Sequence, residues 1–355
     1  MERTNDIRIA AEVPLVSPAD LARRIPMTEA ANATVVGSRA AIRRILSGED
    51  RRLIAVVGPC SIHDPDAAVE YSHRLAGLND QVADTLVLIM RVYFEKPRTA
   101  LGWRGIIIDP TLDGSYDIAR GLSTARKLLV AVSEAGVPAG TEMLDPIVPQ
   151  YIADLVSWAA IGARTTESQT HREMASGLSM PVGFKNSTDG DVQIAINAIL
   201  SARQAHSFLG IDRTGSTCVL RTLGNSDCHL ILRGGKKGPN YQAAEVQRAA
   251  KLLIDAGLRP AMIVDCSHGN SNKKPENQAQ VLRDLVNQRL SRVPGSESII
   301  GFMLESNLES GNQPIPKDLS ELKRGVSVTD SCISWQETEE ILIDTAERLS
   351  QKKGL

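Results

Sequence analysis

The chain alternates short apolar runs with segments of helical periodicity, and it does so eight times. The apolar runs lie at residues 53–57, 85–91, 137–142, 157–164, 180–185, 229–234, 261–268 and 298–306. Helical patterns follow at 65–80, 116–135, 147–156, 167–178, 189–204, 242–256, 276–292 and 336–351. Continuous apolar runs of this length are typical of parallel strands that are buried on both faces. Eight such units favour a closed (β/α)8 TIM barrel, an α/β fold, over an open doubly wound sheet.

Two segments lie outside this repeat. Residues 1–50 form an N-terminal arm, in which a helical pattern at 28–47 is ended by Gly48. Residues 205–224 interrupt the repeat before the sixth run and predict an inserted β-hairpin. We therefore expect one barrel at 51–355 that carries an arm and a hairpin, although ~150 residues per domain would allow two or three domains.

The charge balance and the cysteines exclude several protein classes. The chain has 40 Lys and Arg against 42 Asp and Glu, whereas a nucleic-acid binder is expected to be basic. We find neither an apolar stretch long enough for a transmembrane helix nor a signal-peptide core, so no membrane partner is expected. Five cysteines without a CxxC pair favour a reduced, cytoplasmic protein.

In a (β/α)8 barrel the active site gathers at the carboxyl ends of the strands, so the residues that end each run are the candidates. Four of them are cations: Arg91, Arg164, Lys185 and Arg233. Lys96 and Arg98 follow the second run closely. Cations that converge on one mouth repel one another and require an anion there. Arginine forks suit phosphate and carboxylate, so the cluster predicts a site for two phosphates, or for a phosphate and a carboxylate.

The other strand-end residues suggest a metal site. Cys60, His268 and Glu305 end three of the runs, and Asp330 follows the last one. A thiolate, an imidazole and carboxylates could hold a divalent ion, but this mixture does not choose among Mn, Fe, Co, Cu and Zn. The residues alone leave open a buried cysteine and hydrogen-bonded core polar groups. Glu142, which ends the third run, is a further candidate acid or base.

Long motifs in the chain resemble those of type I 3-deoxy-D-arabino-heptulosonate 7-phosphate (DAHP) synthases. They are GPCSIHD (58–64), MRVYFEKPRTALGWRG (90–105), IGARTTESQTHREMASGLSMPVGFKNSTDG (161–190), LRGGK (232–236), DCSHGNSNK (265–273), LESNLESGNQ (304–313) and VTDSCISW (328–335). The resemblance implies a condensation of phosphoenolpyruvate with D-erythrose 4-phosphate and water that gives DAHP and phosphate. This reaction is the first step of the shikimate pathway of aromatic amino acid biosynthesis.

The resemblance also assigns roles to residues. It makes Cys60, His268, Glu305 and Asp330 the ligands of one divalent metal ion per subunit. It places Arg91, Lys96, Ala163, Arg164, Lys185 and Arg233 in the phosphoenolpyruvate pocket, and Arg98 and Thr99 at erythrose 4-phosphate. Cys60 and His268 thereby join the catalytic set. Lys96 is the candidate proton donor to the new alkoxide, and Glu142 the candidate for positioning or deprotonating the water.

The resemblance further implies a homo-oligomer, a tetramer or a dimer, with feedback inhibition by an aromatic amino acid. The arm and the hairpin resemble the parts that build the effector site and the interface. The effector pocket would contain Asp145, Gln150, Ser179, Phe208 and Gly210. Gly210 stands where phenylalanine-sensitive forms tend to carry serine. The smaller residue leaves room for a hydroxyl group, so we expect tyrosine as the effector.

Two alternatives remain at this point. One is 3-deoxy-octulosonate 8-phosphate synthase, which shares the barrel and the phosphoenolpyruvate chemistry but uses arabinose 5-phosphate. The KPRT sequence at 96–99 and the long arm argue against it. The other is a catalytically silent barrel that senses amino acids, which would be expected to have lost metal ligands that this chain retains.

Overall fold

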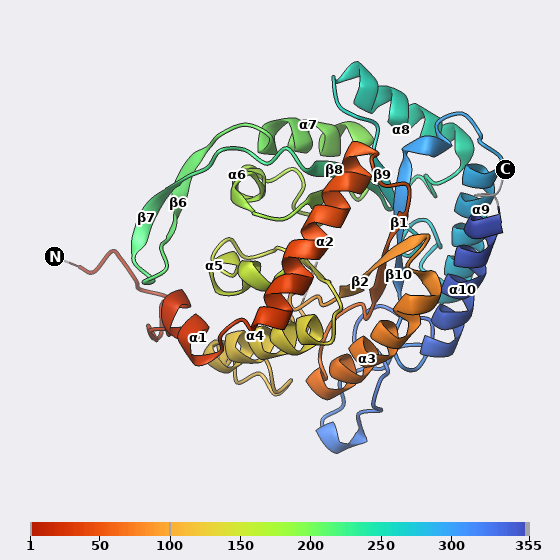
Figure 1. Cartoon of the computed structure of the whole chain (residues 1–355). Helices are drawn as coiled ribbons and strands as arrows, with labels where there is room; N and C mark the ends of the chain where they lie inside the picture. The colour runs from red at the N-terminus through yellow and green to blue at the C-terminus, as the bar shows by residue number, and fades with distance from the viewer. Residues whose placement is uncertain (1, 99–100, 352–355) are drawn as a thin grey trace.

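A computed structural model describes residues 2–98 and 101–351 of the chain. Its core is a closed barrel of parallel strands in the order β1-β10-β9-β8-β5-β4-β3-β2 (Figure 1). The strands are β1 (Leu53–Gly58), β2 (Leu86–Arg91), β3 (Ala139–Glu142), β4 (Trp158–Ile161), β5 (Val182–Lys185), β8 (Cys228–Leu232), β9 (Met262–Asp265) and β10 (Ile299–Glu305). Each overlaps one of the eight predicted runs, which confirms the TIM barrel.

Helices surround the barrel where the sequence predicts them. They are α3 (Pro65–Val82), α4 (Ile118–Glu134), α5 (Pro149–Ile152), α6 (Gln169–Gly177), α7 (Val192–Ala202), α8 (Ala243–Asp255), α9 (Gln278–Leu290) and α10 (Trp335–Gln351). Local signals set their ends: Asp64, for example, caps α3 by accepting bonds from the amides of Asp66 and Ala67, directly before Pro65. No helix in the described part of the chain is both long and apolar enough to cross a membrane.

The strands bury both faces, as their apolar character requires. Alternate side chains point inward, and Ile54, Val56, Trp158 and Met303 belong to a core inside the barrel. The residues between them, such as Ala55, pack against the helices in a second and larger core. The interior of the barrel is therefore filled at this level by side chains, and polar groups can gather only beyond it, at the carboxyl ends.

The arm is packed against the barrel and not detached from it. Its long helix α2 (Glu29–Ser47) matches the predicted pattern and ends at Gly48, which is left-handed with φ 78°. Ile42 and Ile45 of α2 belong to the inner core of the barrel. Arg39 of the same helix donates to the carbonyl of Val156, just before β4. Helix α2 therefore closes the amino-terminal end of the barrel, across which Figure 1 shows it lying.

The hairpin of β6 (Ser207–Ile211) and β7 (Thr217–Arg221) is antiparallel and lies within the predicted segment 205–224. The Arg213 carbonyl at its tip accepts a bond of 2.8 Å from the amide of Ala19. Ala19 lies in α1 (Pro18–Arg24), a helix that the periodicity did not predict. Its signal is local, because Ser17 caps the helix and proline follows at the first position. Figure 1 shows the hairpin reaching away from the barrel toward α1.

Candidate active site

A cavity of about 620 Å³ opens at the carboxyl ends of the barrel strands. The predicted site residues that line it are Cys60, Lys96, Arg98, Glu142, Ala163, Arg164, Lys185, Arg233, His268, Glu305 and Asp330. These residues come from widely separated parts of the sequence and meet because parallel strands end on the same rim. Thr99, the other predicted sugar-phosphate contact, lies outside the described residues.

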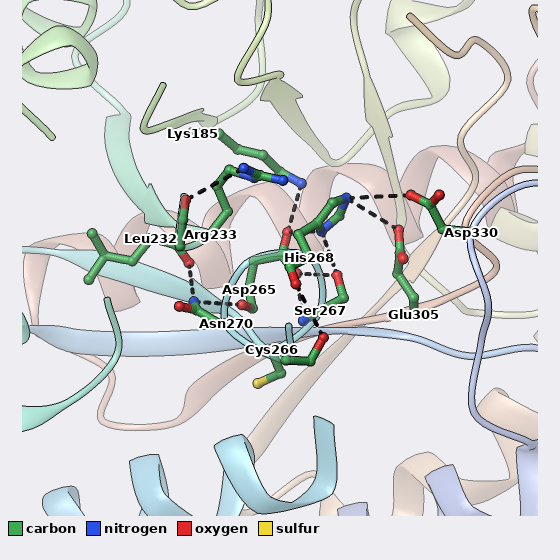
Figure 2. Close-up of polar contacts among 12 residues, drawn as sticks. Lys185, Leu232, Arg233, Asp265, Cys266, Ser267, His268, Asn270, Glu305 and Asp330 are labelled. Carbon is green, nitrogen blue, oxygen red and sulfur yellow. Dashed lines mark hydrogen bonds and ion pairs between the residues drawn. The ribbon is translucent and has the colours of Figure 1, made fainter. Parts of the chain in front are cut away.

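The four predicted metal ligands lie together. The ligand atoms of Cys60, Glu305 and Asp330 are within 4.8 Å of one another. The Nε2 atom of His268 is 3.9 Å from Glu305 Oε1 and 4.0 Å from Asp330 Oδ2 (Figure 2). One sulfur, one nitrogen and two carboxylates suit a borderline divalent ion such as zinc, iron or manganese. The cluster therefore fits a metal site in both spacing and donor chemistry.

The charge state of Glu305 in this cluster favours the binding of a cation. Burial raises the pKa of Glu305, but the charges of His268 and Arg91 outweigh burial and hold that pKa below its usual value. Glu305 is therefore a carboxylate at neutral pH. Burial also raises the pKa of the Cys60 thiol to about 11, and Glu305 adds to the rise. A metal ion that binds here must displace the thiol proton.

Arg91 differs from the other predicted cations because it does not line the cavity. Its side chain is fully buried, with Nη2 3.0 Å from Glu305 Oε1 and the guanidinium 4.0 Å from the ring centre of Tyr93. Its Nη1 atom has no hydrogen-bond partner among the described residues. The charge of Arg91 is thus partly neutralised within the protein. Its contact with phosphoenolpyruvate stays a prediction.

Lys185 also has an internal partner that sequence reasoning missed. Its Nζ lies 2.8 Å from Oδ2 of Asp265, which is fully buried at the end of β9. Burial raises the pKa of Asp265, but Lys185 and His268 outweigh it and hold that pKa well below its usual value. The predicted run ends at His268, whereas β9 ends three residues earlier, at Asp265. Asp265 was therefore not among the predicted strand-end residues. The mouth therefore holds fewer unpaired cations than the sequence suggested.

The cations with freer head groups lie nearer the opening. Arg164 is exposed and donates to the carbonyl of Pro97 at 2.9 Å. Arg233 and Lys96 are half-buried in the wall of the cavity. Burial lowers the pKa of Lys96, but Cys60 and Glu305 outweigh it and raise that pKa above its usual value. Lys96 is therefore a cation beside the metal cluster, and the cavity can bind anions.

Glu142 lines the same cavity from the end of β3. It is buried, and its Oε1 atom has no hydrogen-bond partner among the described residues. Gly162 makes room for it, because a Cβ at that position would lie 2.3 Å from Oε1. A buried carboxylate oxygen without a donor requires a partner from within the cavity. A water or a substrate hydroxyl is a suitable partner.

The predicted effector residues lie outside this cavity. Phe208 and Gly210 are neighbours on one face of β6, and Gln150 lies in α5. Asp145 follows β3 and influences the buried carboxyl of Glu95. The carbonyl of Ser179 accepts a bond of 3.1 Å from Arg43 of α2. The residues thus come from the hairpin, α5 and two loops, and their grouping into one effector pocket stays a prediction.

A TIM barrel with a cationic cavity and an adjacent thiol, imidazole and carboxylate cluster defines an enzyme for small anionic substrates. The chain belongs to the DAHP synthetase I family, whose model matches residues 25–343. This match confirms the resemblance drawn from the motifs and the enzyme class that it implies.

Individual relatives agree with this family. The chain is 53% identical over 346 residues to the tyrosine-sensitive phospho-2-dehydro-3-deoxyheptonate aldolase of Salmonella typhimurium, covering 98% of this chain and 96% of the relative. It is 48% identical over 352 residues to the phenylalanine-sensitive enzyme of Escherichia coli, covering 99% of each. The structure of the Francisella tularensis enzyme superposes with a TM-score of 0.93 at 47% identity, covering 96% of this chain and 98% of that one.

Proposed function

We propose that the chain condenses phosphoenolpyruvate with D-erythrose 4-phosphate to give DAHP and phosphate. The observation that carries the proposal is the meeting of Lys96, Arg164, Lys185 and Arg233 with the Cys60 cluster in one cavity. Two phosphorylated substrates repel each other, and a cationic cavity offsets this repulsion while it fixes their orientation. Family membership favours this reaction over the octulosonate synthase and over a silent barrel.

The cations divide the cavity between the substrates. Arg164, Lys185 and Arg233 lie on consecutive barrel segments and hold the phosphate and carboxylate of phosphoenolpyruvate, with the backbone of Ala163 beside them. Arg98 holds the phosphate of the sugar at the exposed side of the cavity.

Cys60, His268, Glu305 and Asp330 would hold one divalent ion. When bound, such an ion supplies a Lewis acid that polarises the aldehyde. C3 of phosphoenolpyruvate then bonds to the aldehyde carbon, and Lys96 donates a proton to the resulting alkoxide oxygen. Lys96 is a cation at neutral pH, so it carries the proton that is donated. The physiological metal is not selected by these four donors.

Carbon–carbon bond formation leaves C2 of phosphoenolpyruvate electron-poor, and a water adds there. Oε1 of Glu142 accepts a hydrogen bond from this water and then its proton, consistent with the missing partner of that atom. The adduct at C2 loses inorganic phosphate and becomes the ketone of the product. Its C2–O bond to phosphate breaks, the proton of the C2 hydroxyl leaves with the phosphate, and exchange of one proton with solvent at Lys96 and at Glu142 restores both residues.

Regulation and assembly complete the proposal. The effector is tyrosine, bound by residues of the Phe208 and Gly210 region, and the arm at 1–50 with the hairpin mediates both inhibition and a homotetramer or homodimer. One comparison supports tyrosine: a tyrosine-sensitive relative is 53% identical, whereas a phenylalanine-sensitive one is 48% identical. All five cysteines are free thiols, which supports a reducing, cytoplasmic location.

The test is a phosphate-release assay with metal-stripped protein that is reloaded with Mn²⁺, Fe²⁺, Co²⁺, Cu²⁺ or Zn²⁺. We expect turnover with erythrose 4-phosphate and at most a trace with arabinose 5-phosphate. Turnover with arabinose 5-phosphate alone would show that the chain catalyses the 3-deoxy-octulosonate 8-phosphate synthase reaction instead. Failure of every divalent ion to restore activity would favour the silent barrel.

A further inference from the structure

Asp265 lies between the two halves of the site, at the carboxyl end of β9. It is fully buried and does not line the cavity, so it touches neither solvent nor substrate. A buried carboxylate is costly unless charged partners and hydrogen bonds surround it. The contacts that surround Asp265 reach both the predicted anion-binding residues and the predicted metal ligands.

One oxygen of Asp265 holds a residue from each half. Its Oδ2 atom lies 2.8 Å from Nζ of Lys185 and 3.0 Å from Nδ1 of His268 (Figure 2). Its Oδ1 atom accepts from the amide of Ser267 at 3.1 Å and from the Ser267 hydroxyl at 2.6 Å. Every side of the carboxylate is therefore engaged, which fixes its orientation.

These contacts determine which nitrogen of His268 is free. The Ser267 hydroxyl uses its proton on Asp265 Oδ1, so it can only accept from His268 Nδ1, which is 2.6 Å away. Both neighbours of Nδ1 are then acceptors, so a proton is held on Nδ1. Nε2, which faces Glu305 and Asp330, is the nitrogen left for a metal ion.

The backbone conformation of His268 supports its contact with the Asp265 carboxylate. His268 adopts φ 55°, a left-handed conformation that a non-glycine residue rarely takes. The turn is held by Asn270, whose side-chain amide donates to the carbonyl of Asp265 at 2.9 Å and to that of Leu232 at 3.2 Å. This turn brings the imidazole of His268 back onto the Asp265 carboxylate.

We propose that Asp265 is a positioning residue that fixes Lys185 for the substrate anion and His268 for the metal ion through a single carboxylate oxygen. The inference rests on the proposed function for the roles of Lys185 and His268. Lys185 has three ammonium protons, and the bond to Asp265 uses one and directs the remaining ones. Affinity for the anion and affinity for the metal therefore depend on one group that contacts neither.

The first test is Asp265→Asn, with the metal alone as the probe. Co²⁺ is titrated into metal-stripped protein, and its visible absorption reports both affinity and ligand geometry. We expect affinity to fall about 10- to 100-fold, as is typical when the partner of a ligating histidine is removed. In the reloaded enzyme, KM for phosphoenolpyruvate should rise several-fold more than KM for the sugar phosphate. Unchanged Co²⁺ affinity would overturn the proposal.

Two further variants distinguish a loss of side-chain positioning from a general loss of stability. Ser267→Ala removes the hydroxyl that contacts Asp265 Oδ1 and His268 Nδ1 but leaves both contacts of Oδ2 in place, so Co²⁺ affinity and KM for phosphoenolpyruvate should both change less than in Asp265→Asn. Asp265→Asn with Lys185→Met removes both buried charges, which should restore thermal stability if the single variant unfolds. Its Co²⁺ affinity should remain low, because His268 still lacks its partner; a return to normal affinity would overturn the proposal.

The outcomes also distinguish this inference from the proposed function. Co²⁺ titration needs no substrate, so it reports on Asp265 whatever the enzyme condenses. If the unmodified protein binds Co²⁺ and phosphoenolpyruvate but does not consume erythrose 4-phosphate, the proposed reaction fails and the role of Asp265 stands. If the reaction proceeds and Asp265→Asn changes neither affinity, only the present inference fails.

Discussion

Arg91 and Glu305 form a buried ion pair at the floor of the cavity, with 3.0 Å between Nη2 and Oε1. The same Glu305 oxygen faces His268, so the pair joins the core of the barrel to the metal cluster. An enclosed pair contributes little as a pair, but either partner alone is costly.

Replacing one partner should therefore destabilise the fold. We expect Arg91→Met to lower the free energy of unfolding by about 3–5 kcal/mol, because the buried Glu305 carboxylate loses its guanidinium partner. Urea denaturation measures the change. The double variant Arg91→Met with Glu305→Gln is the control and should recover much of the loss, since neither member of this pair is then charged. A single variant as stable as the unmodified protein would contradict this account of the pair.

Cys60 should be essential for metal binding and dispensable for folding. Cys60→Ala is expected to lower turnover by at least about 100-fold, because the soft ligand of the cluster is lost. Unfolding should remain cooperative, since one small buried side chain is shortened. Cys218→Ala, in the hairpin and half-buried, is the matched control and should keep full uninhibited activity. Near-normal activity of Cys60→Ala would refute the metal assignment.

Metal affinity should also rise with pH. The Cys60 pKa of about 11 means that the thiol is protonated at neutral pH, and metal binding releases its proton. Each unit of pH between 7.5 and 9 should then raise the apparent affinity about tenfold, measured by chelator competition. A pH-independent affinity over this interval would mean that Cys60 is not a ligand as thiolate.

Glu95 gives the fold a pH dependence that is independent of metal. Burial raises its pKa to about 7, and the Asp145 carboxylate adds to the rise. An unfolded glutamate ionises near 4.5, so between 4.5 and 7 the unfolded state binds fewer protons and stability falls as pH rises. At about 1.4 kcal/mol per pH unit, the loss above pH 7 is about 3 kcal/mol.

Glu95→Gln should remove this loss. The variant is expected to be up to about 3 kcal/mol more stable than the unmodified protein at pH 8, and equally stable near pH 4. Urea denaturation across this range measures the difference. Glu134→Gln, on the exposed end of α4, is the matched control and should change neither value. Equal stability of both proteins at pH 8 would place the Glu95 pKa near its ordinary value.

Gly210→Ser should weaken inhibition by tyrosine. A Cβ at Gly210 would come within 2.6 Å of Leu220 Cδ1 on the paired strand, so Leu220 must move, and the added hydroxyl fills further space. We expect the tyrosine concentration for half-inhibition to rise about tenfold, which corresponds to about 1.4 kcal/mol. Gly210→Ala separates the effect of Cβ from that of the hydroxyl. Unchanged inhibition in both variants would remove the basis for the effector assignment.

The barrel and most of its cavity could be predicted because burial on both faces leaves a direct mark on the sequence. The run at 53–57 is apolar at every position, as a strand buried on both faces requires. Cys60 follows this run closely, so it lies at the carboxyl end of the strand, where it lines the cavity. Asp265 could not be predicted in the same way. The apolar run does not reveal where the strand ends and the turn begins, and only the left-handed backbone at His268 brings the two side chains together.

The role of α2 also escaped prediction, because periodicity identifies an apolar face but not the surface that covers it. Ile42 and Ile45 complete the core inside the barrel. A chain shortened to residues 51–355 would therefore expose the inner side chains of the strands to water. We would not expect it to be an active enzyme that merely lacks regulation. Point substitutions are therefore a better route to a feedback-resistant form than deletion of the arm, because deleting α2 would open the amino-terminal end of the barrel.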